Sequence, residues 1–215
     1  MTKLICFDLW ETLATEPSTF EYCWEPFANK YPTKISWPKI HELIAEILQK
    51  KDQSTDRSIA EILKNFGVTD DTLVLEIKKR WEYSCDQVTL FLETIEALTN
   101  LRGAGFKLGL ITNTSRYGWK TANRKFSLGS YFDYMALSFE CGHIKPEQDI
   151  FEFIERKSGF SGSDITMVGD SYKSDFQAPR ERGWGSILLD RFKANKYPEA
   201  EPIVQNLLEL KSILL

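Results

Sequence analysis

The sequence predicts an α/β protein built on a doubly wound parallel sheet, with a small α-helical bundle inserted after the first strand. From Leu92 nearly to the C-terminus, short apolar runs of strand length alternate with amphipathic helical patterns. This alternation produces parallel strands joined by right-handed crossovers. Between residues 14 and 88 the pattern is helical only. We therefore expect a core domain of residues 1–14 and 89–215 and an inserted helical domain of residues 15–88.

The first strand is predicted from a continuous apolar segment that ends at an acid. Residues 4–7, LICF, are followed directly by Asp8. A run of this kind is typical of a strand buried on both faces of a parallel sheet. Ligands of open α/β sheets bind just beyond the carboxyl ends of the strands, so Asp8 is a candidate functional residue. The alternative is an ordinary turn or cap residue.

The inserted domain is expected to hold helices with apolar stripes and a core of their own. Residues 18–31 are rich in aromatic side chains. A helix with Ser36 as its N-cap candidate extends to the lysines at 50 and 51. A polar linker over 52–56 leads to a second helix that ends near Gly67, and Asp70 and Asp71 begin a third helix that runs through Trp81.

The second part of the core alternates regularly between the two kinds of element. The expected helices are 94–102, 147–157, 176–182 and 203–215, and the expected strands are 107–111, 132–138, 165–168 and 186–189.

Composition limits the classes of protein that fit. The apolar content of 42% and charged content of 27% are typical of a soluble globular chain. No apolar run approaches the roughly 20 residues of a membrane span, and no signal peptide is recognisable, so we expect a cytoplasmic protein without a membrane partner. The four cysteines show no CxxC pairing, which favours reduced thiols over a zinc site. A net charge of −4 gives no basic footprint for nucleic acid.

Polar side chains collect at the predicted strand ends. Asp8, Thr112 and Asp170 each end a strand, Lys145 follows the third strand, and Asp175 lies shortly beyond Asp170. Each has an ordinary explanation as a helix cap, a solvated lysine or a surface charge. Because the strands are parallel, however, these residues are expected at one edge of the sheet.

Together these residues suit phosphoryl transfer. Asp8 and Asp170 can share an oxygen-ligand site for Mg²⁺, and Asp8 can attack phosphorus to form an aspartyl-phosphate. The metal, Lys145, the Thr112 hydroxyl and backbone N–H groups after Asp8 would neutralise the transferring group, and Lys145 would keep Asp8 ionised.

Four segments in this order resemble the signature motifs of the haloacid dehalogenase-like (HAD) hydrolase superfamily. They are FDLWETL at 7–13, LGLITNTS at 108–115, SFECGHIKPEQDIF at 138–151 and MVGDSYKSD at 167–175. The resemblance covers essentially the whole chain, and the helical insertion stands where subfamily I carries its helical C1-type cap. It implies a Rossmann-like core, a Mg²⁺ cofactor and a small phosphorylated substrate.

The resemblance also implies a role for each matching residue. Asp8 would be nucleophile and metal ligand, and the Trp10 backbone carbonyl would be a further ligand next to the phosphate. Thr112, Asn113 and Lys145 would bind the phosphate. Asp170 would be the principal additional metal ligand, with Asp175 supporting it. Thr12 matches the threonine that steadies the first motif loop.

Position 10 departs from the pattern of the phosphatases, which usually carry a second Asp there as general acid and base. Trp10 can neither protonate the leaving group nor activate water. Glu11 is adjacent, but the backbone has a different direction at that position. We therefore expect a Mg²⁺-dependent phosphatase that lacks the usual general acid and base at this position.

The alternatives are a 2-haloacid dehalogenase-like hydrolase and a phosphate-binding or regulatory protein of weak activity. A dehalogenase gains from the aromatic residue at position 10, but it would lack Gly169-Asp170 and carry an early cap arginine, whereas the first arginine here is Arg57. The substrate and the oligomeric state are left open.

Overall fold

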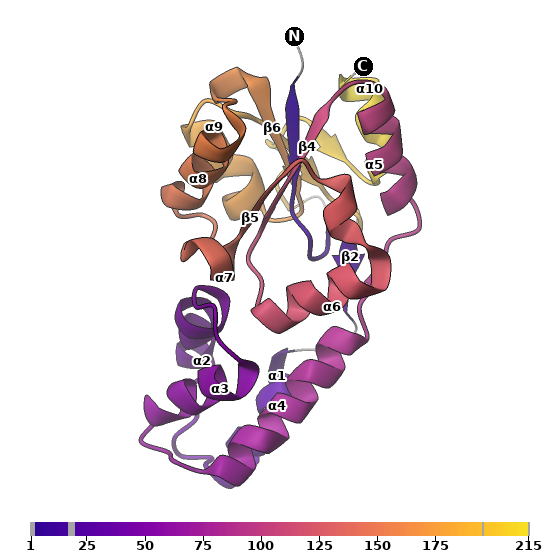
Figure 1. The fold of residues 1–215 in the computed structure, drawn as a ribbon. Coiled ribbons are helices and arrows are strands. Elements are labelled where there is room, and N and C mark those ends of the chain that lie inside the picture. Colours follow the sequence, from indigo (N-terminus) through magenta and orange to yellow (C-terminus); the bar gives the residue numbers. More distant parts are fainter. Residues whose placement is uncertain (1–2, 17–19, 195, 215) are drawn as a thin grey trace.

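A computed structural model describes residues 3–16, 20–194 and 196–214. Six strands form one parallel sheet in the order β5-β4-β1-β6-β7-β8, with β1 near the middle (Figure 1). Their bounds are Tyr134–Leu137 for β5, Lys107–Thr112 for β4, Leu4–Phe7 for β1, Ile165–Gly169 for β6, Gly185–Leu189 for β7 and Ile203–Val204 for β8. The predicted fold class is confirmed.

Helices cover both faces of this sheet, so alternate residues of β1 are buried in two different clusters. Ile5 and Phe7 belong to the cluster that includes α5 (Thr94–Gly103), α6 (Arg116–Phe126) and α10 (Leu210–Leu214). Leu4 and Cys6 belong to the cluster that includes α8 (Gln148–Ser158) and α9 (Ala178–Glu181). In Figure 1 the two sets of helices lie on opposite sides of the sheet. Burial on both faces explains why β1 is apolar throughout.

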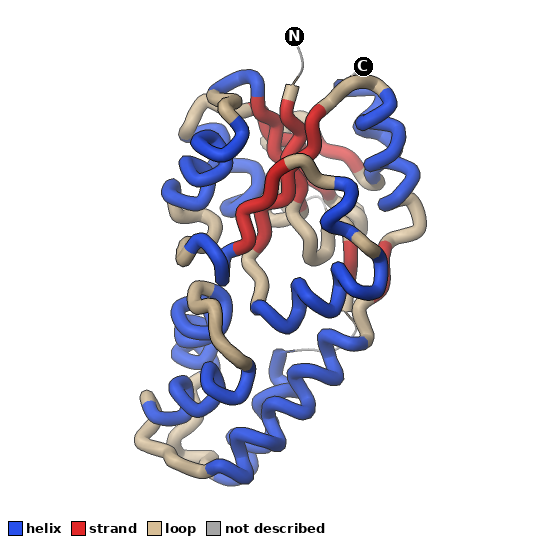
Figure 2. The backbone as a smooth tube through the Cα atoms, in the orientation of Figure 1, coloured by secondary structure: helices blue, strands red, loops and turns tan. Residues whose placement is uncertain are grey.

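The helices between β2 (Ala14–Thr15) and β3 (Thr89–Leu90) form a separate body below the sheet, which we call the helical region (residues 20–86; Figure 2). Its elements are α1 (Phe20–Lys30), α2 (Trp37–Leu43), η1 (Ile44–Gln49), α3 (Thr55–Lys64) and α4 (Asp71–Asp86). They enclose their own hydrophobic cluster, built around Trp24 and Phe27. The predicted third helix is confirmed in detail, because the Asp70 side chain accepts a hydrogen bond from the Leu73 N–H as its N-cap.

The two chain connections between the sheet and the helical region lie side by side. Strand β2 (Ala14–Thr15) pairs antiparallel with β3 (Thr89–Leu90). Next to this pair, the Leu13 carbonyl accepts hydrogen bonds from the Phe91 N–H at 3.2 Å and the Thr94 hydroxyl at 2.7 Å. The segment after Asp8 is therefore held against the segment that re-enters the sheet. These two-residue strands are too short to give the alternation from which a strand is predicted.

Several predicted boundaries are wrong. The linker ends at Ser54, since α3 begins at Thr55, and the first predicted helix changes to π-helix at Ile44. The third strand is only Tyr134–Leu137, because Ser138 begins a short helix, α7 (Ser138–Cys141). The helix predicted over 176–182 begins four residues earlier as the π-helix η4 (Tyr172–Gln177). Residues 18–19 of the aromatic stretch and residue 215 of the predicted last helix lie outside the described residues.

The C-terminal segment is also not the single helix that its apolar residues predicted. It begins as the edge strand β8 and continues through the 3₁₀ turn η5 (Leu207–Glu209) into α10. Two further 3₁₀ turns, η2 (Leu128–Tyr131) and η3 (Gly162–Asp164), precede β5 and β6. Periodicity cannot assign such short pieces to a strand or a helix type, because each spans less than two helical turns.

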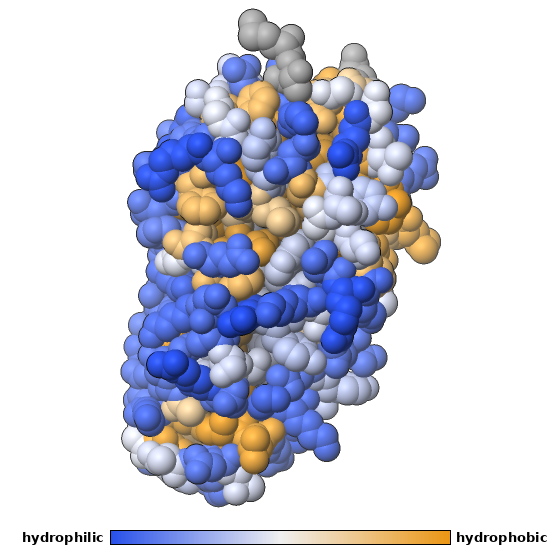
Figure 3. Space-filling view, viewed as in Figure 1, coloured by the Kyte–Doolittle hydropathy of each residue, from blue (hydrophilic) through white to orange (hydrophobic). Residues whose placement is uncertain are grey.

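The four cysteines are free thiols, as expected, and three of them are buried. Within the described part of the chain, no helix has the length and apolar character needed to cross a membrane. Figure 3 shows mainly hydrophilic residues on the face turned to the viewer, with hydrophobic residues in small separate patches.

Candidate active site

The carboxyl ends of β1, β4 and β6 meet at one edge of the sheet, as predicted. Phe7 lies in register with Leu110 on one side and Val168 on the other. The Asp8 N–H continues the ladder by donating to the Val168 carbonyl at 3.0 Å. Thr112 is the last residue of β4, and Asp170 follows β6 directly. Strand register alone therefore brings Asp8, Thr112 and Asp170 to one edge.

Lys145 is the buried cation of this edge. Its Nζ lies 2.8 Å from Oδ1 of Asp8 and 2.6 Å from Oδ1 of Asp175, and its side chain is only 3% exposed. Burial alone would lower the pKa of the Lys145 ammonium, but the negative charges of Asp175 and Asp8 outweigh burial and raise that pKa. Lys145 is therefore a charged centre between two carboxylates.

Three carboxylates gather at this edge, two of them in contact with Lys145. Oxygen atoms of Asp8, Asp170 and Asp175 lie within 4.8 Å of one another. Although Asp170 as a residue is solvent-exposed, burial of its carboxyl group and repulsion from Asp8 raise its pKa to about 6. Burial, together with repulsion from Asp8, also raises the pKa of Asp175 despite its contact with Lys145. The site thus has more negative charge than Lys145 balances.

Asp175 is held in place from two directions. Its Oδ1 accepts from Lys145, and its Oδ2 accepts from the Ser171 N–H at 3.1 Å. A Cβ on residue 169 would overlap the Asp175 carboxyl group, so glycine is required at that position for this approach. Asp170 keeps a looser contact, accepting from the Thr12 hydroxyl at 3.4 Å. Of the two acids after β6, Asp175 is the buried one and Asp170 is the more exposed.

The Thr112 hydroxyl is buried and has no hydrogen-bond partner among residues 3–16, 20–194 and 196–214. A buried, unpaired hydroxyl costs free energy unless something fills its hydrogen bond. A donor left open at the edge that holds Asp8 fits a ligand oxygen as its acceptor.

Asn113, which was expected to bind phosphate, instead uses its side chain on the loop of Lys145. Its Nδ2 donates to the Lys145 carbonyl at 2.8 Å, and its Oδ1 accepts from the Lys145 N–H at 2.7 Å. Ser138 joins the same two loops through the N–H and carbonyl of Thr114. The amide of Asn113 therefore holds the loop that carries Lys145, and a contact of Asn113 with phosphate stays a prediction. Ser138 stands in the third motif segment, but its partner lies 24 residues earlier and local pattern does not reveal the contact.

The loop after Asp8 is a closed turn. The N–H groups of Leu13 and Ala14 both donate to the Leu9 carbonyl at 2.9 Å, and the Glu11 N–H donates to the Ala14 carbonyl at 2.7 Å. Glu11 has a φ of 55°, which is rare for a residue other than glycine. Its carboxylate accepts from the Thr15 hydroxyl at 2.6 Å. This contact engages one oxygen of the Glu11 side chain within its own turn.

Trp10 packs under the first turn of α6. Its side chain is half-buried against the cluster on that face of the sheet. A Cβ placed on Gly118 would lie 3.3 Å from Cζ2 of the indole, so glycine leaves room for the ring. Position 10 therefore carries a packed ring next to the site, without an acidic group.

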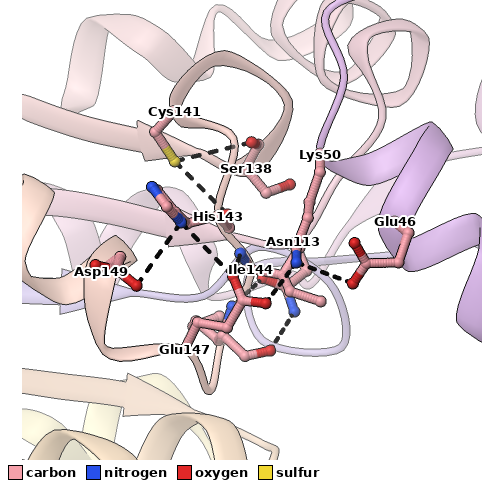
Figure 4. A network of polar contacts seen from close by, with 10 residues as sticks. Glu46, Lys50, Asn113, Ser138, Cys141, His143, Ile144, Glu147 and Asp149 are labelled. Carbon is pink, nitrogen blue, oxygen red and sulfur yellow. Dashed lines mark hydrogen bonds and ion pairs between the residues drawn. The ribbon is translucent and has the colours of Figure 1, made fainter.

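Ion pairs join the helical region to the loops of the site. Lys50 of the helical region bridges Glu46 and Glu147 (Figure 4). Glu147 also accepts from the Ile144 N–H at 3.1 Å, immediately before Lys145. Arg116, at the start of α6, pairs with Asp52 at 3.0 Å. The helical region thus contacts the two loops that carry Lys145 and Thr112, and nothing local in the sequence predicts either pair.

Comparisons with known proteins find relatives and solved structures that resemble this chain over nearly its whole length. Glyceraldehyde 3-phosphate phosphatase from Methanothermobacter thermautotrophicus is 24% identical over 228 residues, covering 100% of both chains. The structure of 2-haloacid dehalogenase from Pseudomonas syringae pv. Tomato has a TM-score of 0.68 at 22% identity and covers 100% of this chain and 98% of its own. The magnesium-bound orthorhombic form of YfnB from Bacillus subtilis has a TM-score of 0.64 at 19% identity, covering 99% and 98%.

The match to a whole family is more decisive than any of these pairs. Residues 2–183 match the family described as haloacid dehalogenase-like hydrolase. That match spans all four motif segments and most of the described sheet. This chain therefore belongs to the haloacid dehalogenase-like hydrolase family.

Proposed function

We propose that this hydrolase is a Mg²⁺-dependent phosphatase acting on a small phosphorylated metabolite through an aspartyl-phosphate on Asp8. The observation that carries the proposal is the arrangement around Lys145, with one buried ammonium among three carboxylates and the unpaired Thr112 hydroxyl at the same edge. Glyceraldehyde 3-phosphate phosphatase, similar over the whole chain, supports a small phosphorylated substrate. A panel of phosphoesters assayed for phosphate release with and without Mg²⁺ tests the proposal directly.

The donor set fits a magnesium ion. Hard carboxylate oxygens are the ligands that Mg²⁺ prefers, and it takes one or two of them together with substrate and water. The raised pKa values of Asp170 and Asp175 reflect negative charge that Lys145 alone does not balance. Asp8, Asp170 and the Trp10 carbonyl would hold the ion, with Asp175 supporting Lys145 and Asp170. When bound, the ion would neutralise charge on the phosphoryl oxygens.

The residues of the chain then have distinct tasks. One oxygen of Asp8 forms a bond to phosphorus as the bond from phosphorus to the leaving oxygen breaks, which leaves an acyl phosphate on Asp8. Lys145 and the Thr112 hydroxyl bind the phosphoryl oxygens, and Asn113 holds the Lys145 loop in register. Water then attacks phosphorus, restoring the Asp8 carboxylate and releasing inorganic phosphate.

The leaving oxygen has no acid beside it, because Trp10 replaces the usual Asp. General acid catalysis is worth about 10²- to 10⁴-fold, and alkyl phosphates with strongly basic leaving groups need it most. We expect measurable activity on aryl and acyl phosphates and weak activity on sugar or glycerol phosphates. Equal kcat/KM for an aryl and an alkyl phosphate would show that another group supplies the proton.

A matched pair of variants isolates this effect from packing. Trp10→Asp and Trp10→Asn both remove the indole from under α6, but only the first adds a carboxyl group. We expect Trp10→Asp to exceed Trp10→Asn by about 10²-fold or more in kcat/KM for an alkyl phosphate, with similar melting temperatures. Equal alkyl phosphate activities in two folded variants would count against a missing acid at this position.

The metal site has a test that needs no substrate. A ligand present at 100 times its Kd stabilises the folded state by about 2.7 kcal/mol. We expect Mg²⁺ to raise the melting temperature of the wild type and of a control, Asp164→Ala, at an exposed position of η3, but not of Asp170→Ala. An undiminished shift in Asp170→Ala would place the metal elsewhere.

We further propose that the helical region, within the predicted bounds 15–88, acts as a cap over the site. Its ion pairs from Lys50 and Asp52 reach the loops of Lys145 and Thr112 and support this role. YfnB, of the same fold, is described with interdomain movement, which is compatible with a cap that opens. A cytoplasmic location stays a prediction.

Dehalogenation is the second candidate, favoured by the aromatic residue at position 10 and by the similarity in fold to 2-haloacid dehalogenase. That reaction requires no metal, whereas Asp170 adds a third carboxylate to an edge that already has excess negative charge. Halide release from 2-haloacids in the absence of Mg²⁺ would favour dehalogenation over phosphate transfer.

A further inference from the structure

Arg191 makes an unusual set of contacts just after β7. Its guanidinium donates to the backbone carbonyls of Glu11 and Thr12, which follow Asp8 in the first motif loop. It also pairs with Glu93 at 2.5 Å, and its Cζ lies 3.6 Å from the centre of the Phe91 ring. The side chain is only 9% exposed. A largely buried arginine side chain with this many partners is held in one orientation.

These contacts complete the anchoring of the loop after Asp8. Arg191 binds the carbonyls of residues 11 and 12, and the Phe91 N–H and Thr94 hydroxyl bind the carbonyl of Leu13. Three successive carbonyls of the loop are thus held by groups 78 or more residues away in the chain. The loop itself is one closed turn through the Leu9 carbonyl, so displacement of its outer side moves the inner side that carries Trp10.

We propose that Arg191 is a positioning residue that fixes the Asp8 loop, and with it the Trp10 carbonyl and Thr12, in the geometry needed for metal binding and phosphoryl transfer. The proposal rests on the proposed Mg²⁺-dependent phosphatase activity. Arg191 touches neither the reacting atoms nor the metal ligands themselves, and it acts through the backbone of residues 11 and 12. The Thr12 hydroxyl in turn donates to Asp170, so the contacts of Arg191 with the loop also help to position the second carboxylate of the proposed metal site.

The expected effect of removing Arg191 can be judged from other groups that orient metal ligands. Loss of a group that orients metal ligands typically lowers metal affinity or activity about 10- to 100-fold. We expect Arg191→Met to raise the Mg²⁺ concentration for half-maximal thermal stabilisation, and to lower kcat, each by about 10-fold or more. KM for the substrate should change less, since Lys145 and Thr112 are not in contact with Arg191.

Two controls separate positioning from general stability. Arg182→Met removes another partly buried arginine, whose ion pair with Glu155 lies on the α8 side of the sheet. Glu93→Gln weakens the ion pair but leaves both carbonyl contacts of Arg191. We expect Glu93→Gln to show a smaller loss than Arg191→Met, and Arg182→Met to lose stability without loss of Mg²⁺ affinity.

Amide hydrogen exchange of the peptide covering residues 9–15 measures the loop without metal or substrate. Arg191→Met should exchange faster there than the wild type, with Arg182→Met unchanged. The proposal is overturned if exchange in this peptide is unchanged, or if it accelerates while Mg²⁺ half-saturation and kcat stay at wild-type values. If the wild type shows no Mg²⁺ response at all, the proposed function fails, and the exchange result still decides whether Arg191 holds the loop.

Discussion

Asp8→Asn is expected to abolish turnover while leaving the protein folded. The amide is nearly the same size as the carboxylate but is not a nucleophile, so the acyl phosphate cannot form. Loss of the nucleophile in covalent hydrolases costs about 10⁴-fold or more in kcat. Phosphate release should therefore fall to background, and the melting curve should keep its cooperative transition.

Asp164→Asn is the matched control for this substitution, because it makes the same chemical change at an exposed position. It should keep wild-type activity. Phosphate release at the wild-type rate by folded Asp8→Asn protein would exclude Asp8 as the nucleophile.

Lys145→Met is expected to have the largest effect on stability and to remove activity as well. Lys145 is the buried partner of both Asp8 and Asp175, and removing one side of a buried ion pair costs about 3–5 kcal/mol. Lys107→Met, which loses a pair with Asp133 in which the lysine is 47% exposed, should cost far less stability, because water already screens an exposed ion pair. Urea unfolding of both variants gives the comparison.

The stability loss in Lys145→Met should also depend on pH. Burial raises the pKa of Asp175 already in the wild type, and loss of the ammonium raises it further. An acid with a raised folded-state pKa keeps its proton in the folded protein after the unfolded chain has lost it. Its cost is therefore absent below the unfolded-state pKa, grows as pH rises from there, and levels off above the folded-state pKa. The cost in the variant, whose folded-state pKa is higher, keeps growing after the cost in the wild type has levelled off. The difference in unfolding free energy from wild type should thus be larger at pH 8 than at pH 5. A difference that does not change with pH would mean that Asp175 is not left as an uncompensated charge.

The sequence predicts five of the six strands of the sheet, because each of these is a short, mainly apolar run, whereas the edge strand β8 was expected as part of a helix. Asp8, Thr112 and Asp170 stand at the ends of three of these runs, and parallel register then places them together without further information. Lys145 required the motif resemblance, since a lysine on a loop is ordinarily solvated.

Other parts of the site depend on contacts that no local pattern carries. Arg191 lies 179 positions from Thr12, and the amide of Asn113 bonds to a backbone 32 positions away. The paired strands β2 and β3 have two residues each, and the π-helices η1 and η4 keep the composition of ordinary helices. Tertiary packing sets these features, so no local sequence pattern predicts them.

The most direct test of the account is to trap the phosphoryl group on the enzyme. Because position 10 has no base to activate water, the acyl phosphate should accumulate during turnover of an aryl phosphate with Mg²⁺. After rapid acid quench, mass spectrometry should find an increase of about 80 Da on the peptide that contains Asp8, absent without Mg²⁺ and absent in Asp8→Asn. Two results would contradict Asp8 as the phosphoryl acceptor. One is a burst of the phenol product with the added mass on another residue, and the other is steady turnover with no added mass on any quenched peptide.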